Sequence, residues 1–117
     1  MSTHSALGVQ MEDGSIMGCY VHYDGHTMSE RIKQFLDEHT TTDLVMLIAR
    51  AQSTGGMRGF HTPRADGLVG SVPETDFLED DVPYVIDEAN FYEDHMSTYA
   101  WYLVNYKDKT IEVKERY

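Results

Sequence analysis

Three side chains that can bind a metal stand at alternate positions in the sequence: His22, Asp24 and His26. Residues two apart on a strand point to the same side, so two imidazoles and one carboxylate could face one cation. This ligand set is typical of zinc or iron sites. A metal-activated water with Glu12 as base would make a small hydrolase. The alternative is structural, with His22 hydrogen-bonded on a strand and Asp24 forming a turn before Gly25.

Two other groups of reactive side chains have simpler explanations. Cys19 is the only cysteine and its charged neighbours are acidic, so we expect a small buried hydrophobic residue rather than a nucleophile. Arg58, His61 and Arg64 form the positive cluster of the middle of the chain and could grip phosphate groups, as a nucleotide-sequestering protein requires. The alternative is a solvated loop, because Gly55 and the following glycine end a helix rather than open one.

Charge is distributed unevenly along the 117 residues. Nine Lys and Arg stand against twenty Asp and Glu, which gives a net charge of −11. Residues 66–105 contain no Lys or Arg, and their acidic residues are Asp66, Glu74, Asp76, Glu79, Asp80, Asp81, Asp87, Glu88, Glu93 and Asp94. This charge disfavours nucleic acid and anionic membranes and favours a partner with a basic surface. A solvated acidic face is the alternative.

Aromatic side chains accompany these acids, and aromatic groups are common in protein interfaces. We expect the binding residues to be Tyr20, His22, Asp24, Tyr84, Asp87, Glu88, Tyr92 and Trp101. We assign no catalytic residue and expect no cofactor, with Zn²⁺ or another divalent metal at His22, Asp24 and His26 as the exception.

Hydrophobic periodicity predicts an α+β fold in a single domain, 1–117. The expected strands cover 5–11, 16–23, 84–92, 98–105 and 110–115, the last with Ile111 and Val113 inward. Two helices lie between them, one with an apolar stripe from Met28 to Leu36 and one over 43–52 capped by Thr42. Residues 57–83 show no sustained period, although a short strand could lie there. We expect an antiparallel sheet of four to five strands, built from an N-terminal and a C-terminal hairpin, with both helices on one face.

The stretch from Gly8 to Gly25, about a sixth of the chain, resembles the opening of small uncharacterised accessory proteins of tailed bacteriophages. It carries their pattern EDGS…Y-x-H-[WY]-D-G, with Tyr20, His22 and Asp24 at the matching positions. Tyr23 stands where a Trp is usual, and His26 stands where an aromatic residue is usual. The resemblance implies a phage-encoded protein made in the host bacterial cytoplasm. It implies no activity, and it makes Tyr20, His22 and Asp24 one structural or binding unit.

The leading hypothesis is therefore an acidic accessory protein, more a binder than an enzyme, that modulates a host or phage protein. A nucleic-acid-binding or defence protein is a natural target, because carboxylates can occupy a groove meant for phosphates. The lone cysteine and the absence of a signal peptide or an apolar span favour the cytoplasm. A homo-oligomer is compatible with the sequence. The metal-dependent hydrolase and the nucleotide-sequestering protein are the alternatives.

Overall fold

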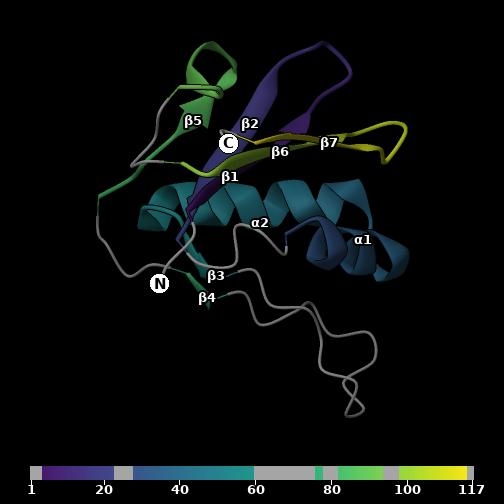
Figure 1. Ribbon diagram of the computed structural model, residues 1–117, viewed down its shortest axis with the longest axis horizontal. Helices are drawn as coiled ribbons and strands as arrows, with labels where there is room; N and C mark the ends of the chain where they lie inside the picture. The colour runs from purple at the N-terminus through teal and green to yellow at the C-terminus, as the bar shows by residue number, and fades with distance from the viewer. Residues whose placement is uncertain (1–3, 23–27, 60–75, 78–81, 94–97, 116–117) are drawn as a thin grey trace.

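The computed structural model describes residues 4–22, 28–59, 76–77, 82–93 and 98–115 (Figure 1). The elements in chain order are β1 (Ser5–Gln10), β2 (Ile16–Val21), α1 (Met28–Glu38), α2 (Thr41–Thr54), β3 (Met57–Gly59), β4 (Asp76–Phe77), β5 (Ile86–Asp87), the 3-10 turn η1 (Glu88–Asn90), β6 (Ala100–Asn105) and β7 (Ile111–Glu115). The predicted α+β fold, with strands near both ends and two helices, is confirmed.

The strands form one sheet in the order β4-β3-β2-β1-β6-β7, and β5 pairs with β2 outside this path. Both predicted hairpins are present, β1 with β2 and β6 with β7, and each is antiparallel. The sheet is nevertheless mixed, because β1 and β6 pair in parallel at its centre. The pairing of β1 with β6 joins segments about ninety residues apart, so it brings the two hairpins side by side.

The turn between β1 and β2 is closed by hydrogen bonds among its own residues. The Asp13 carboxylate accepts hydrogen bonds from the Ser15 hydroxyl at 2.6 Å and the Ser15 N–H at 3.0 Å. These bonds lower the pKa of Asp13. Gly14 has φ +89°, a left-handed conformation that glycine adopts without strain. The loop between β1 and β2 is therefore fixed by its own side chains.

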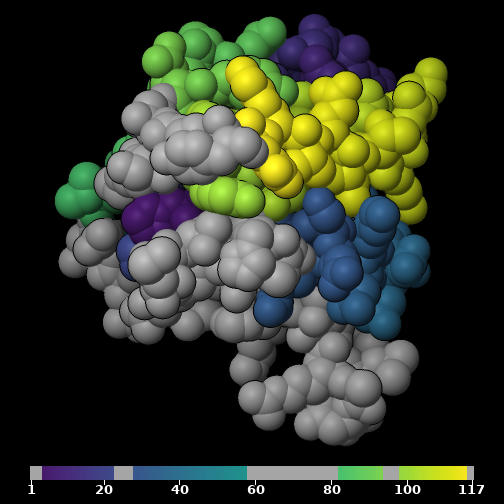
Figure 2. Space-filling view, in the orientation of Figure 1, coloured from purple at the N-terminus to yellow at the C-terminus, as the bar shows by residue number. Residues whose placement is uncertain are grey.

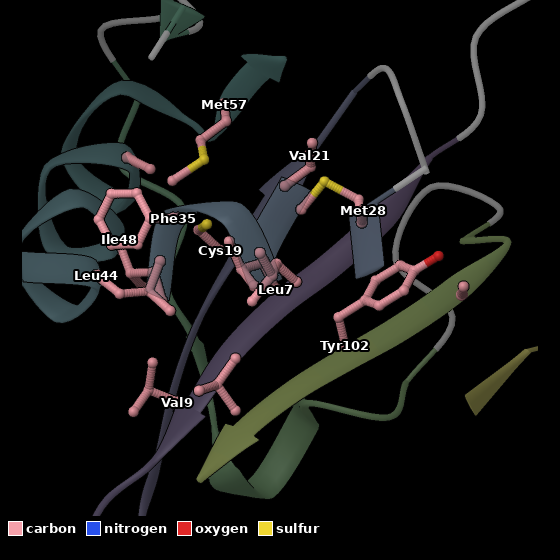
Figure 3. Packing of buried hydrophobic residues seen from close by; sticks show 14 residues of the cluster. Leu7, Val9, Cys19, Val21, Met28, Phe35, Leu44, Ile48, Met57 and Tyr102 are labelled. Atoms are coloured by element: carbon pink, nitrogen blue, oxygen red, sulfur yellow. The ribbon is translucent and has the colours of Figure 1, made fainter. Parts of the chain in front are cut away.

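The helices cover one face of the sheet (Figure 1). Figure 3 shows the core between the helices and the sheet. There Leu7, Val9 and Cys19 of the strands meet Phe35 of α1 and Ile48 of α2. All five side chains have no exposed surface. Fully burying a side chain of this kind contributes about 1.5–3 kcal/mol, so this layer is the main source of stability. The prediction that Cys19 is a buried hydrophobic residue is confirmed.

Helix α2 begins two residues before the predicted start. Its cap is Thr40, not Thr42: the Thr40 hydroxyl accepts from the Asp43 N–H at 3.2 Å, and the Asp43 carboxylate accepts from the Thr40 N–H at 3.0 Å. This reciprocal pair satisfies two N–H groups that a helix start otherwise leaves open. The Thr42 hydroxyl instead forms a hydrogen bond with the Tyr106 hydroxyl at 2.8 Å. The helix ends at Thr54, two residues after the predicted end, and Gly55 caps it in the left-handed conformation that glycine adopts readily.

The opposite face of the sheet carries a second, smaller core. It consists of Ala6, Ile16, Tyr20, Ile86, Phe91, Trp101 and Leu103, with Tyr84 packed against it. Residues 82–93, which we call the acidic segment, lie beside β2, with which β5 pairs (Figure 1), and Phe91 of the segment lies on this face. The strand predicted over 84–92 is present only as β5, where Ile86 and Asp87 pair with β2, and the η1 turn replaces its continuation. The Asn90 side chain accepts from the Asp87 N–H at 2.8 Å and helps to close the η1 turn.

The predictions for the remaining segments had mixed outcomes. Two short strands do lie between residues 57 and 83: β3 pairs with β2, and β4 pairs with β3. The inward position predicted for Val113 is wrong, since its side chain is 44% exposed on the terminal strand β7. In the parts of the chain that the structure describes, neither helix has the length and apolar character needed to cross a membrane.

Candidate functional site

The end of strand β2 carries a cluster of three rings. The Tyr20 hydroxyl and His22 Nδ1 are 2.7 Å apart and share a hydrogen bond. The His4 ring stacks on the His22 ring with centroids 4.7 Å apart, and its edge meets Tyr20 at 5.5 Å. Of the predicted unit of Tyr20, His22 and Asp24, the first two are in contact and Asp24 lies outside the described residues. His4 joins Tyr20 and His22 as a third ring.

His4 was not among the predicted binding residues, because its position beside His22 depends on the hairpin register. In the β1–β2 hairpin Ser5 is opposite Val21, so His4, the residue before β1, lies opposite His22. A histidine one residue before the start of a strand carries no pattern by itself. Its neighbour becomes evident only when the hairpin register is known.

The cluster is held rigidly from beneath. The backbone of Gly56 packs so closely on Tyr20 that a Cβ there would be 2.5 Å from the Tyr20 carbonyl oxygen. The His22 N–H donates to the Met57 carbonyl at 2.9 Å. Gln52 links helix α2 to strand β2 and to the acidic segment. Its side-chain amide donates to the Gly18 carbonyl, and its backbone carbonyl accepts from the Tyr84 N–H, both at 2.8 Å.

The contacts described for His22 bring no further metal ligand to it. Asp24 and His26 lie outside the described residues. Within the described residues, no three His, Cys, Asp or Glu side chains gather as a metal site would require. His22 Nδ1 is engaged by the Tyr20 hydroxyl. The described geometry therefore explains His22 as part of an aromatic hydrogen-bonded cluster.

The acidic segment presents a different kind of surface. Ile86 and Phe91 are fully buried and fix the segment to the sheet. The residues between and beside them point outward: Asp87, Glu88 and Glu93 are exposed, and Val85 is 56% exposed. Because its buried anchors already fix the backbone, such a segment can bind a partner through its exposed acidic and apolar side chains with a smaller loss of conformational entropy.

Strand β7 extends this surface through a stack of aromatic and basic groups. The Lys114 ammonium lies 4.9 Å from the Tyr92 ring centroid and 5.6 Å from that of Trp101. Tyr92 is 44% exposed, whereas Trp101 is only 5% exposed. Partial burial, together with the charge of Glu112, raises the pKa of Tyr92. Tyr92 is thus the accessible aromatic residue, and Trp101 supports it from below.

The structure describes only some of the other predicted site residues. Tyr84 is half-buried against the second core. Arg58 lies in β3, whereas His61 and Arg64 are outside the described residues. Burial raises the pKa of the Cys19 thiol and keeps it protonated, which disfavours a nucleophilic role.

A hollow of about 460 Å³ lies between the two hairpin turns at the carboxyl ends of β1 and β6. Its lining is largely polar and consists of Gln10, Met11, Glu12, Gly14, Asn105, Lys107 and Asp108. Sites for small organic ligands are usually lined by apolar and aromatic groups. The Asn105 side chain already accepts from the N–H groups of the next turn, at 2.9 and 3.0 Å. The hollow is therefore explained by the turns themselves.

Comparison of the chain with protein-family models, with curated proteins and with solved structures gives no match.

Proposed function

We propose that the protein is a non-enzymatic binding protein that attaches to a basic surface on another protein. The observation that carries this proposal is the acidic segment. Its buried anchors, Ile86 and Phe91, fix a row of exposed carboxylates and apolar side chains in one place. Burial of the anchors has already ordered the backbone, so binding costs less conformational entropy.

The composition of the surface favours a basic protein over other partners. Asp87, Glu88 and Glu93 would repel phosphates and attract Lys and Arg. Val85 and Tyr92 supply apolar and aromatic contact area among these charges. A surface of mixed acidic and aromatic character is suited to a protein groove that itself recognises phosphates.

The resemblance to phage accessory proteins suggests where the partner is found. A protein made in the cytoplasm of an infected bacterium meets host enzymes and phage proteins that bind nucleic acid. Their basic grooves are the class of target that the acidic segment fits. Binding there would block access of the nucleic acid and so modulate the target.

Affinity capture tests this proposal with a matched pair of variants. The tagged protein is incubated with bacterial lysate, from infected and uninfected cells, at low and high salt. The test variant is Asp87→Asn with Glu88→Gln in the acidic segment. The control is Asp37→Asn with Glu38→Gln, an exposed acidic pair on α1 that loses the same charge elsewhere.

We expect the wild-type protein and the control to retain the same partner at low salt and to release it at high salt. We expect the Asp87/Glu88 variant to retain much less of the partner at low salt than the wild type and the control do. If the two double variants behave alike, the acidic segment is not the binding site. Capture of nucleic acid in place of a basic protein would also contradict the proposal.

A further inference from the structure

Strand β7 ends the sheet on one side, and within the described residues it pairs only with β6. Its atoms lie at the surface in Figure 2, where residues 111–115 are yellow. A terminal strand offers backbone N–H and C=O groups to another strand. The direction of these groups can be derived residue by residue.

The turn before β7 fixes that direction. The Asn105 N–H donates to the Thr110 carbonyl at 2.8 Å, so these residues are hydrogen-bonded opposite each other. In an antiparallel ladder, bonded and non-bonded pairs alternate. Glu112 and Lys114 therefore direct their backbone groups to Leu103 and Trp101 of β6. The backbone groups of Ile111, Val113 and Glu115 point to the outer edge.

The side chains of β7 are complementary to those of a second β7. Glu112 and Lys114 are two residues apart and therefore lie on one face of the strand with opposite charges. Val113 lies between them on the other face and is 44% exposed. We propose that two copies of the chain pair antiparallel through β7, about a twofold axis at Val113.

This arrangement satisfies both the backbone and the charges. Val113 of each copy faces its counterpart, and Ile111 faces Glu115, so every outward N–H and C=O is hydrogen-bonded. Glu112 of one copy faces Lys114 of the other, twice, at non-bonded positions. There the Cβ atoms of opposite residues are closest, about 4.5–5.5 Å apart. Each Lys114 remains beside Tyr92 and Trp101.

The neighbouring registers are less favourable. A shift that keeps the same outward groups bonded places Glu112 against Glu112, or Lys114 against Lys114. Like charges directly opposite each other destabilise a strand pair. Both shifts also shorten the overlap from the whole strand to about three residues. The pattern of charges along β7 thus selects one register of self-pairing.

The net charge of −11 repels two copies at long range. At physiological ionic strength this repulsion is screened over about 8 Å. The Glu112–Lys114 pairs act at contact distance and are screened less. The opposing effects predict a reversible dimer whose population depends on protein concentration.

Two single charge reversals provide the test, measured by sedimentation velocity over a wide range of protein concentration. We expect the wild-type mass to rise from 13.4 kDa toward twice that value. Glu112→Lys alone places Lys against Lys, and Lys114→Glu alone places Glu against Glu, so each should be monomeric. An equimolar mixture of the two restores opposite charges at both positions and should form a heterodimer.

Val113→Pro is a third variant, and it leaves both charges in place. The Val113 N–H points outward and takes no part in the β6 ladder. Proline at this position therefore removes only the hydrogen bond that each copy donates to the other. We expect a folded monomer, with circular dichroism as the check on folding. A wild-type protein that is monomeric at all concentrations would overturn the proposal. So would dimers that persist in Val113→Pro, or a mixture of the reversals that stays monomeric.

Discussion

Two small residues decide how the second face of the sheet is covered. Gly8 and Gly18 are directly opposite each other in the β1–β2 pair, and the ring of Phe91 lies on both. A Cβ at Gly8 would be 2.5 Å from Phe91 Cε1, and one at Gly18 would be 2.9 Å from Phe91 Cδ1. The ring therefore occupies space that only glycine leaves open, and it anchors the acidic segment.

Gly8→Ala should destabilise the fold by about 1–3 kcal/mol, the usual cost of inserting a methyl group into a packed site. Because the clash is with Phe91, the cost should nearly vanish when Phe91→Ala is also present. Urea unfolding of the four proteins in this cycle measures the coupling. If the two effects simply add, the Phe91 ring does not lie on Gly8.

Tyr102 makes the stability of the protein depend on alkaline pH. Burial, with smaller effects of Glu115 and Tyr99, raises the pKa of Tyr102 from 10.0 to about 12. The folded state holds the phenol proton more tightly than the unfolded chain does. The contribution of Tyr102 is therefore complete below about pH 10 and is lost as the pH rises toward 12.

The measurement compares the free energy of unfolding of wild-type protein and Tyr102→Phe across this range. The difference between them should shrink as the pH rises from 10 to 12, because only the wild type has the Tyr102 phenol and loses its contribution to stability. A difference that stays constant would mean that Tyr102 is not shielded from solvent.

At the scale of elements, local sequence patterns were sufficient for both hairpins and both helices. A stripe at helical spacing in α1 reflects burial on one side of the helix. The alternation in β1 marked the strand, although both of its faces are buried, because Ala6 and Gly8 supply only small side chains to the second face. The pairing of strands far apart in the chain leaves no such local pattern in the sequence, so it could not be predicted. The parallel pairing of β1 with β6 and the packing of Phe91 on Gly8 depend on contacts between the two ends of the chain.

The candidate site shows the same division. The family resemblance grouped Tyr20 with His22, and their spacing of two residues at the end of β2 places both side chains on one side. The stacking of His4 on His22 requires the hairpin register. The roles of Tyr92 and Trp101, one exposed and one buried, depend on where β7 lies relative to the acidic segment.

The start of α2 gives a prediction at this scale. Thr40→Ala removes the cap and should lower the free energy of unfolding by about 0.5–2 kcal/mol. Thr42→Ala loses only an exposed hydrogen bond to Tyr106 and should cost less. Chemical unfolding of both variants decides between them. An equal or larger loss for Thr42→Ala would contradict the assignment of Thr40 as the cap.

At the scale of the whole molecule, the two proposals concern one side of the sheet. Pairing through β7 places Glu112 and Lys114 of both copies on a common face. Phe91 of the acidic segment lies on that same face, so a dimer would present two acidic segments on one face of the joined sheet. Two linked sites bind a target with two basic patches more tightly than one site does. A monomeric variant such as Val113→Pro should therefore retain each contact and lose this gain.

The most direct test of the binding proposal is the salt dependence of affinity, measured by calorimetry with the purified partner from the capture experiment. We expect the affinity of the wild-type protein to fall steeply as salt is raised, because the contact pairs opposite charges. Asp87→Asn with Glu88→Gln should weaken binding about tenfold at low salt and flatten the salt dependence. Asp37→Asn with Glu38→Gln should match the wild type. Equal affinities and equal salt dependence for all three proteins would contradict the account.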